Sequence, residues 1–305
     1  MATDSAMTAL VTDFAALEAA LEERRSLVDA ALRRVWEPGR SPEVAAAVED
    51  SLFAPAKRLR PVVALLVADL FGCPAPVVLP AGCAVEMAHT ASLILDDLPA
   101  MDDATSRRGR PACHVAHGEA NAILAAFALL NRAFAILAGG WAGAPPAATR
   151  AAVAADLARA VGMDGMIAGQ ARDLSMTGRP LDFASLEFIH SRKTGALFTA
   201  SAALGAAAAG AGASETAAVV GYAKNLGLAF QVVDDIIDAT VGAAEAGKDV
   251  GKDKEKTTFV SFAGIPGARQ LAEELIAASQ ESLAVFGPRA QPLRDLARYV
   301  VIRKK

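Results

Sequence analysis

The sequence predicts an all-α, single-domain helical bundle of about ten or more helices around a central apolar pocket. Apolar residues recur at helical spacing along nearly the whole chain of 305 residues, and strand-like alternation is scarce. Breaks rich in Gly and Pro, such as "WEPGR", "GGWAGAPPAA" and "FGPRAQP", divide this pattern into segments of ordinary helix length. Because no linker or short repeat separates these segments, residues 1–305 are expected to form one domain.

The first helix is predicted in the amino-terminal segment. Phe14, Leu17 and Leu21 recur at helical spacing, and Glu and Arg side chains occupy the opposite face. No basic stretch precedes an apolar run here, so a cleaved secretory signal is not expected. Residues 194–214 form the longest uncharged run, but this run consists mostly of Ala, Gly, Ser and Thr. It is therefore expected to form tightly packed interior helices and no transmembrane segment.

Charge and cysteine content narrow the functional class. The formal net charge of -4 gives no general attraction to nucleic acid or to an anionic membrane surface. Any phosphate group must therefore be bound by local clusters of Lys and Arg. The three cysteines, Cys73, Cys83 and Cys113, are odd in number and form no metal-type pairs. This usage indicates reduced thiols in a cytoplasmic protein.

The first of two acidic clusters lies in the stretch "SLILDDLPAMDDATSRRGR". On the helix that leads into it, His89, Ser92 and Asp96 share one face, because they lie three or four residues apart. Pro99 weakens the helix beyond this point and allows Asp102 to turn back toward Asp96. Aspartates this close repel one another unless a cation neutralises them.

The second acidic cluster lies in "FQVVDDIIDATVGAAEAGKDVGKDKEK". Helical steps of three and four residues relate Gln231, Asp234, Asp235 and Asp238, so these side chains are predicted to share one helix face. Val and Ile flank that face, whereas a solvated charged face normally mixes both signs and avoids apolar bulk. The carboxylates are therefore expected to face a buried site.

Magnesium is the cation that these clusters favour. Carboxylate oxygens without soft ligands suit Mg2+, which keeps several waters and is commonly shared with substrate phosphates. One DDxxD motif is equally compatible with a solvated acidic patch, but two clusters favour a metal. Neither cluster has the oxygen spacing and Gly of an EF-hand loop. Both clusters precede bases suited to a diphosphate. These bases are Arg107, Arg108 and Arg110 after the first cluster and Lys248, Lys252, Lys254 and Lys256 after the second.

The chain resembles the bacterial trans-polyprenyl diphosphate synthases, and most closely the geranylgeranyl diphosphate synthases. The resemblance is carried by "AKRLRP", "EMAHTASLILDD", "DDLPAMD", "GMIAGQARDL", "IHSRKTGALF" and "FQVVDDIID", which occur in the family's order and spacing. It covers essentially the whole chain. It implies a magnesium-dependent homodimer that condenses isopentenyl diphosphate head-to-tail with allylic diphosphates (dimethylallyl, geranyl, farnesyl) and releases diphosphate.

The resemblance also implies roles for individual residues. Magnesium, with about three ions per active site, is implied to be bound by Asp96, Asp102 and Asp234. The acidic walls are completed by Asp97, Asp235 and Asp238. The allylic diphosphate is held by Arg107, Lys193 and Lys248. Isopentenyl diphosphate is held by Lys57, Arg60, His89 and Arg108. The oxygens directed toward the carbocation belong to Thr194 and Gln231.

Some of these residues are open to other interpretations. A His on an apolar face, such as His89, is also typical of an ordinary core, and Lys57 and Arg60 are also compatible with plain surface charge. Pro61 is a favourable first helical residue, so a helix amino terminus is expected to add its dipole to these cations. The family usually has Gly-Gly where this chain has Pro55-Ala56, and the lysine loop is shorter. No role is therefore assigned to Lys252, Lys254 and Lys256.

Product length is predicted from the helix that leads to Asp96, where Ala91 and Ser92 lie roughly 6 to 8 Å below by helical rise. In farnesyl diphosphate synthases resembling this chain, an aromatic side chain at one of these positions floors the pocket. Its absence predicts a product of about four isoprene units, with a farnesyl diphosphate synthase as the alternative. A terpene cyclase is expected to lack the set Lys57, Arg60 and His89. A non-catalytic partner subunit is expected to have lost one acidic cluster, and both are present.

Overall fold

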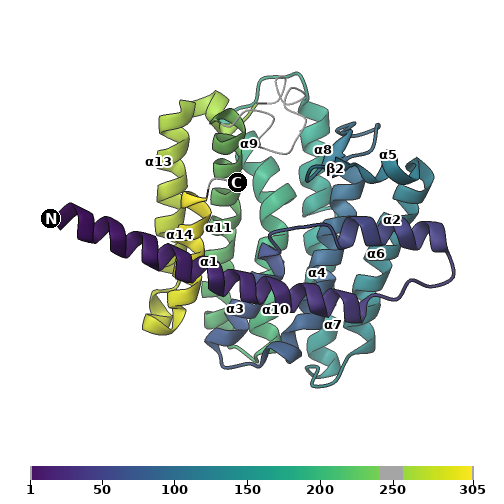
Figure 1. Ribbon diagram of the computed structural model, residues 1–305, viewed down its shortest axis with the longest axis horizontal. Helices are drawn as coiled ribbons and strands as arrows, with labels where there is room; N and C mark the ends of the chain where they lie inside the picture. Colours follow the sequence, from purple (N-terminus) through teal and green to yellow (C-terminus); the bar gives the residue numbers. More distant parts are fainter. Residues whose placement is uncertain (1, 241–256, 304–305) are drawn as a thin grey trace.

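The computed structural model describes residues 2–240 and 257–303, and helices account for nearly all of this part of the chain (Figure 1). The first helices are α1 (Ala2–Val35), α2 (Pro42–Leu52), α3 (Leu59–Leu70) and α4 (Ala75–Asp96). Next come α5 (Cys113–His117), α6 (Glu119–Gly139), α7 (Ala147–Val161), α8 (Met166–Met176) and α9 (Phe183–His190). The remainder are the π-helix η1 (Ser191–Gly195), α10 (Ala196–Ala208), α11 (Ala213–Thr240), α13 (Phe259–Ser282), the 3-10 helix η3 (Ala284–Ala290) and α14 (Gln291–Ile302). The all-α prediction is confirmed.

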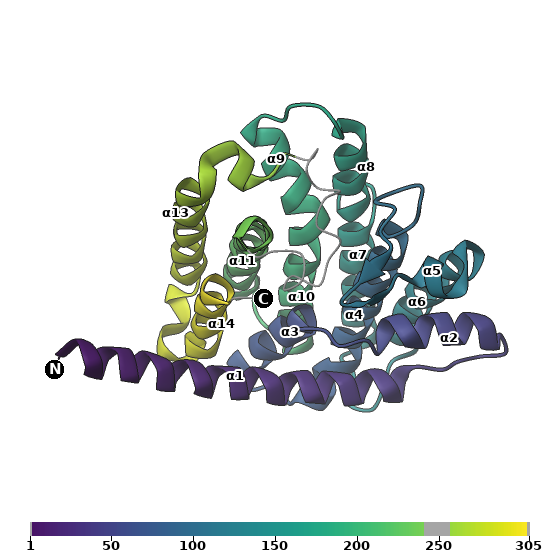
Figure 2. The ribbon, with the colours of Figure 1, turned by 45° about the horizontal axis from the view of Figure 1, so that its top comes forward.

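The helices that end in the two acidic clusters stand on either side of α10. This helix packs against α4 on one side and against α11 on the other (Figure 1). On their far sides, α4 packs against α6 and α11 packs against α13. The long helix α1 crosses one side of the bundle, and its amino-terminal end extends beyond the other helices (Figure 2). Two helix ends rich in carboxylates are thereby held at a distance set by one intervening helix.

Two large apolar clusters hold this arrangement together. One is built around α4 and α6 and includes the fully buried Met87 and Leu129. The other joins α3, α10, α11 and α14 and includes Phe198, Tyr222 and Leu296. Burying each large apolar side chain stabilises the fold by about 1.5–3 kcal/mol. The Tyr222 hydroxyl, fully buried, donates to the Leu293 carbonyl at 2.7 Å, so burial leaves no unpaired polar group there.

The run of small residues at positions 194–214 forms the end of η1, α10 and the start of α11. A Cβ atom on Gly205 would lie 2.4 Å from the Ala64 carbonyl oxygen, so α10 and α3 approach too closely for any larger residue. Most of α10 is buried. The prediction of tightly packed interior helices in this run is confirmed.

Two other helices, α4 and α6, are long and apolar enough by length and composition to cross a membrane. In α4, 72% of the apolar window is buried inside the protein, as expected for a core helix. In α6 only 39% of the window is buried. The apolar face that α6 leaves exposed is therefore a surface feature, and it bears on assembly below.

A short β-hairpin contains the only strands among the described residues. The strands β1 (Ser106–Arg107) and β2 (Arg110–Pro111) pair antiparallel, with Arg107 opposite Arg110. The two turn residues, Arg108 and Gly109, have φ of 55° and 73°. Two consecutive left-handed residues close a two-residue hairpin whose twist matches its strands. Helical periodicity could not predict this turn, and it places two arginines at the mouth of the cavity described next.

Candidate active site

A cavity of about 460 Å3 is lined by residues from α4, α8, η1, α11, the hairpin and the segment before α3. The predicted residues that line it are Lys57, Arg60, His89, Ser92, Asp96, Arg107, Arg108, Lys193, Thr194, Gln231, Asp234 and Asp238. Its apolar lining includes Leu59, Leu93, Met166, Phe230 and Ile237. The fold therefore brings together most of the predicted site, from segments far apart in the sequence.

The carboxyl end of α4 forms the first acidic wall. Asp96 is the last residue of this helix, and its side chain is 16% exposed. Burial raises its pKa to about 6, with Asp102 raising it further and Lys193 opposing the shift. The amide of Asp102 donates to the Asp96 carbonyl at 2.9 Å, so the chain turns back after Pro99 as the sequence predicts. The turn brings the two predicted metal ligands of this wall together.

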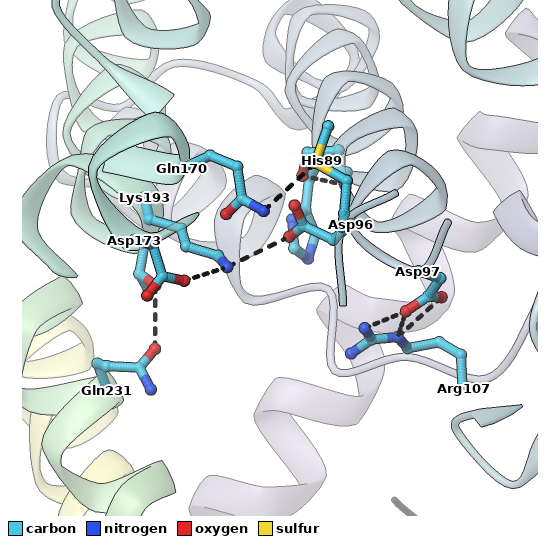
Figure 3. Close-up of polar contacts among 11 residues, drawn as sticks. His89, Asp96, Asp97, Arg107, Gln170, Asp173, Lys193 and Gln231 are labelled. Carbon is cyan, nitrogen blue, oxygen red and sulfur yellow. Dashed lines mark hydrogen bonds and ion pairs between the residues drawn. The ribbon is translucent and has the colours of Figure 1, made fainter. Parts of the chain in front are cut away.

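Asp97 does not line this cavity, although the resemblance places it in the acidic wall. Its side chain is 3% exposed and is bound by Arg107, whose Nε donates to its two carboxylate oxygens at 3.0 and 3.1 Å (Figure 3). Burial alone would lower the pKa of Arg107, but the hydrogen bonds and charge of Asp97 raise it. Asp97 thus anchors a cation of the cavity from behind.

The second acidic wall lies on α11. Gln231, Asp234 and Asp238 line the cavity, but Asp235 is buried on the other side of the helix. Its carboxylate accepts hydrogen bonds from Gln231 Nε2 at 3.0 Å and from the amide of Phe259 at 2.9 Å. Burial raises the pKa of Asp235 to about 6. The shared face predicted for all four residues is therefore correct for three, and Asp235 ties α11 to the start of α13.

The π-helix η1 carries Lys193 and Thr194 into the space between the two walls. Lys193 Nζ lies 3.0 Å from Asp173 Oδ2 and 3.9 Å from Asp96 Oδ2 (Figure 3). Thr194 Oγ1 donates to Gln231 Oε1 at 3.0 Å. A Cβ atom on Gly169 of α8 would lie 2.4 Å from the Lys193 amide nitrogen, so only glycine permits this approach. Such π-bulges are frequent at functional sites because they re-aim side chains.

Asp173 is a site residue that the sequence interpretation missed. It lies on α8, within the stretch "GMIAGQARDL", and forms the shortest ion pair of Lys193. Gln170, one turn earlier, lines the cavity, and its Nε2 lies 3.6 Å from the Met101 sulfur. Polar side chains three residues apart on one helix were the available signal. Only the packing of α8 on η1 shows that they face the acidic clusters.

The basic wall is formed where the chain enters α3. Arg60 Nη1 lies 3.0 Å from His89 Nε2, and its guanidinium stacks 4.8 Å from the centre of the Phe198 ring. Burial lowers the pKa of His89 well below its ordinary value, and the Arg60 charge lowers it further. His89 is therefore a neutral acceptor for Arg60. The helix begins at Leu59, two residues earlier than the start predicted at Pro61.

Arg303, near the carboxyl end, also reaches the second wall, which nothing in the local sequence pattern indicates. Its Nη2 lies 3.0 Å from Asp234 Oδ1 and donates to the Phe230 carbonyl at 2.9 Å. The guanidinium also stands 3.9 Å from the centre of the Phe230 ring, over which Lys57 lies at 5.6 Å. Phe230 thus contacts two cations, of which Arg303 is paired with Asp234.

The two residues predicted to set product length are placed differently. Ser92 lines the cavity. Ala91 does not line it and is fully buried in the apolar core cluster around α4. The length-setting role of both residues stays a prediction. Lys248, predicted to hold the allylic diphosphate, lies outside the described residues.

The residues of the cavity fit magnesium held jointly with a diphosphate. Within residues 2–240 and 257–303, no three Asp, Glu, His or Cys side chains converge closely enough to form a complete metal cage. Mg2+ does not need one, since it usually binds through one or two carboxylates plus substrate phosphates. The buried Nε of Arg60 has no hydrogen-bond acceptor in the described part of the chain. An unpaired buried donor beside two carboxylate walls suits an anionic ligand that brings its own oxygens.

Comparison with known proteins agrees with this geometry. A model of the polyprenyl synthetase family matches residues 41–284, which is more than half of the chain. The chain belongs to the polyprenyl synthetase family. It is 39% identical over 286 residues to a geranylgeranyl diphosphate synthase of Cyanophora paradoxa, covering 93% of this chain and 95% of that protein.

Two further relatives of this polyprenyl synthetase differ in name. A dimethylallyltranstransferase of Fischerella ambigua is 40% identical over 286 residues, covering 93% of this chain and 82% of that protein. The crystal structure of an FPP/GFPP synthase from Zymomonas mobilis matches with a TM-score of 0.83 at 33% identity, covering 94% of this chain and 99% of that one. These names share prenyl transfer but not one product length. Product length must therefore be argued from the cavity.

Proposed function

We propose that this polyprenyl synthetase is a geranylgeranyl diphosphate synthase. It condenses isopentenyl diphosphate with dimethylallyl, geranyl and farnesyl diphosphates in turn, and it releases one diphosphate at each step. The observation that carries the proposal is one cavity in which Asp96 and Asp234 stand on separate walls while Lys57, Arg60 and Lys193 supply positive charge. Two opposed groups of ligands are what two diphosphate substrates require.

The first step is ionisation of the allylic carbon–oxygen bond. Bound Mg2+, about three ions in our proposal, supplies the neutralisation that a diphosphate leaving group needs. Lys193 and Arg107 hold the same diphosphate, each pre-oriented by a carboxylate, Asp173 and Asp97 respectively. Fixed cations aimed at developing negative charge need no reorganisation during the reaction. Asp173 and Asp97 keep Lys193 and Arg107 in such fixed positions.

The second substrate is placed on the basic wall. Lys57, Arg60 and Arg108 line this side of the cavity and are proposed to hold isopentenyl diphosphate. Burial lowers the pKa of Arg60 to about 10, so it is still charged at neutral pH. His89 acts through Arg60, as the acceptor that orients the guanidinium. The double bond then lies between the two diphosphates, where the new carbon–carbon bond forms.

The carbocation must meet that double bond before it meets water. Leu93, Met166, Phe230 and Ile237 supply the apolar part of the lining. The Thr194 hydroxyl donates to Gln231, so its oxygen lone pairs are left to face developing positive charge. The departing diphosphate takes up the final proton, which completes a cycle that needs no protein nucleophile.

Product length follows from space on α4. No aromatic side chain stands at Ala91 or Ser92, and Ser92 faces the cavity. A growing tail directed away from Asp96 along α4 therefore meets small side chains first, which favours a product of about four isoprene units over three. A farnesyl diphosphate synthase is the alternative if another element closes the pocket earlier.

Incubation of the purified protein with radiolabelled isopentenyl diphosphate, Mg2+ and each allylic diphosphate tests the proposal. Chromatography of the dephosphorylated products is expected to give geranylgeraniol. Farnesol as the end product would favour the alternative synthase. A hydrocarbon made without consumption of isopentenyl diphosphate would identify a terpene cyclase, and no turnover by the protein alone would identify a non-catalytic partner subunit.

We also propose that the enzyme is a cytoplasmic homodimer with no nucleic-acid partner. All three cysteines are free thiols, which suits a reducing compartment. On α6, Ile123, Leu124 and Phe127 lie on one face and are 38%, 52% and 66% exposed. Such a face on a core helix suits burial against a second copy. Phe127→Glu is expected to give monomers by light scattering after gel filtration, and an unchanged mass would reject this interface.

A further inference from the structure

Arg58, like Lys57 and Arg60, is among the residues around the cavity, but its guanidinium is bound by protein groups and its side chain is almost fully buried. Nε donates to Asp29 Oδ1 at 2.8 Å, and Nη1 donates to Glu86 Oε1 at 2.8 Å. The Arg58 side chain is 1% exposed and that of Glu86 is 2% exposed. Burial alone would lower the pKa of Arg58, but Glu86 and Asp29 raise it, so the group keeps its charge. A buried cation satisfied in this way is a structural element.

The same guanidinium also holds the loop from which it projects. Nη2 donates to the carbonyls of Leu52 at 2.6 Å and Ala54 at 3.2 Å. Leu52 is the last residue of α2, where helix carbonyls lack partners within the helix. The loop between α2 and α3 is therefore wrapped around the side chain of its own Arg58. One residue fixes the end of α2 and the start of α3 together.

The backbone of Arg58 is unusual in a way that this wrapping explains. It is the residue before the first turn of α3 and has φ 51° and ψ 31°, in the left-handed region. Residues other than Gly adopt this region only where the surroundings compensate the strain. Pro55 and Ala56 are not among the residues with positive φ, so the left-handed residue before α3 is Arg58 itself. Its side-chain bonds hold it there.

A single turn of α4 binds both Arg58, the last residue of the loop, and Arg60, in the first turn of α3. Glu86 binds Arg58, and His89, three residues later, accepts from Arg60. Positions three apart lie on the same helix face, so this face aligns the loop in register with α4. Glu86 is almost fully buried, and its carboxylate would be costly to bury without a cation. Each residue of the pair therefore needs the other to be buried, and the pair fixes the position of the loop relative to α4.

We propose that Arg58 and Glu86 form a positioning pair that presents Lys57 and Arg60 to the diphosphate of isopentenyl diphosphate. The inference rests on the proposed function, because it deepens the substrate site of that reaction. Arg58 does not contact the substrate. It sets the distance and direction of the two cations that do, through a fork geometry that lysine cannot reproduce. The allylic site is anchored separately, because Lys193 is held by Asp173, whereas Arg58 and Glu86 bind each other.

Calorimetric titration of isopentenyl diphosphate alone tests this, because without an allylic partner the substrate binds and does not react. In Arg58→Lys the charge is kept and the fork is lost, and the Kd for isopentenyl diphosphate is expected to rise about ten-fold. The Kd for an unreactive allylic thiolodiphosphate, measured with Mg2+, is expected to change less than about two-fold. In steady state the KM for isopentenyl diphosphate rises while kcat at saturation is retained.

Matched variants separate positioning from general destabilisation. Arg294→Lys is the control, since Arg294 also holds backbone carbonyls, those of Gly287 and Leu283 at 2.8 and 3.1 Å, away from the cavity. It is expected to leave both Kd values unchanged. Glu86→Gln keeps the size and one acceptor but removes the charge, and it is expected to weaken isopentenyl diphosphate binding about three-fold. If Arg58→Lys does not fold, the Kd of Glu86→Gln for isopentenyl diphosphate tests the positioning pair.

The outcomes distinguish the two proposals. If the wild-type protein does not bind isopentenyl diphosphate, the proposed function fails. If the wild type binds and Arg58→Lys and Glu86→Gln bind equally well, the positioning pair is rejected while the function stands. An equal loss of affinity for both ligands also overturns the pair, because it shows a general structural role.

Discussion

The two acidic walls use the same pair of adjacent aspartates in different ways. In each pair the first residue, Asp96 or Asp234, lines the cavity, and the second, Asp97 or Asp235, is buried behind it. Asp97 binds a side-chain cation, Arg107. Asp235 binds an amide side chain and the backbone N–H of Phe259, at the start of α13. The α4 wall therefore anchors charge, whereas the α11 wall anchors the next helix.

The two adjacent aspartates of a DD motif therefore need not have the same role. Successive residues on a helix point about 100° apart, so only one of two neighbours can face a given cavity. The other is free to serve the fold.

The largest effect is expected from the two cavity-facing aspartates. Asp96→Ala and Asp234→Ala each remove a carboxylate from one wall, and turnover is expected to fall by about 100-fold or more in each. The helical circular dichroism should stay native, because both side chains face the cavity and Arg303, the partner of Asp234, keeps its bond to the Phe230 carbonyl. Assays with purified variants measure this, and near-normal turnover in either one would reject the two-wall model.

A large change of product is expected from filling the space on α4. Ser92→Phe and Ala91→Tyr should shift the main product from geranylgeranyl to farnesyl diphosphate, since a ring blocks the growing tail. Ala91 is fully buried, so its variant is also expected to lose about 1–3 kcal/mol of stability by overpacking. Ala229, five residues before Asp234 as Ala91 is before Asp96, offers the control on α11.

Ala229→Tyr is expected to cost similar stability without shortening the product. Chromatography of dephosphorylated products decides among these variants. If the α4 variants still make mainly geranylgeraniol, product length is controlled elsewhere and the two walls do not differ in this respect.

Substitution of the two buried aspartates, Asp97 and Asp235, is expected to have different effects on stability and on the KM for the allylic diphosphate. Asp97→Asn leaves Arg107 without its counter-charge, and breaking such a buried pair is expected to cost about 3 kcal/mol of stability. It should also raise the KM for the allylic diphosphate about ten-fold, because Arg107 loses its orientation. Asp235→Asn disturbs hydrogen bonds only, at about 1–2 kcal/mol, and should leave that KM within about two-fold. Urea unfolding and steady-state kinetics measure both, and similar KM values in the two variants would contradict the contrast.

Removing a cation from either side of the cavity is expected to raise the KM for one substrate only. Arg60→Ala is expected to raise the KM for isopentenyl diphosphate, and Lys193→Ala that for the allylic substrate, each by about ten-fold. The reason is that Arg60 is held by His89, whereas Lys193 is held by Asp173 and Asp96. Initial rates with one substrate varied at a time give the two constants, and equal effects on both would refute the assignment.

The smallest effect concerns the pH dependence of stability. The pKa of His89 lies well below its ordinary value because the ring is buried and faces Arg60. The folded protein therefore binds no proton there, while the unfolded chain does so below about pH 6.5. The contribution of this site is present above that pH and is lost as pH falls, by at most about 1.4 kcal/mol per unit. His89→Gln should remove this slope in urea unfolding between pH 5 and 7.5, and parallel curves for the two proteins would show that the ring titrates alike in the folded and unfolded states.

The helices and the two acidic clusters could be predicted from the order of the residues alone. Helical periodicity, Gly and Pro breaks and the turn after Pro99 depend on interactions between residues a few positions apart. Such interactions can be inferred from the sequence. The cavity-facing residues Asp96, Asp234 and Lys193 also lie in recognisable local motifs. Their chemistry, carboxylates and bases without other donors, was sufficient to predict magnesium and diphosphate.

Which of these groups point into the cavity, and what holds them, depends on how the helices pack. Asp97 and Asp235 turn away because packing of the hairpin and of α13 offers them buried donors. Asp173 and Arg303 enter the site from other segments, through contacts of α8 with η1 and of the carboxyl end with α11. Arg58 and Glu86 meet across 28 positions of sequence. No periodic pattern encodes such pairs, because their partners are set by how helices pack and not by spacing along one helix.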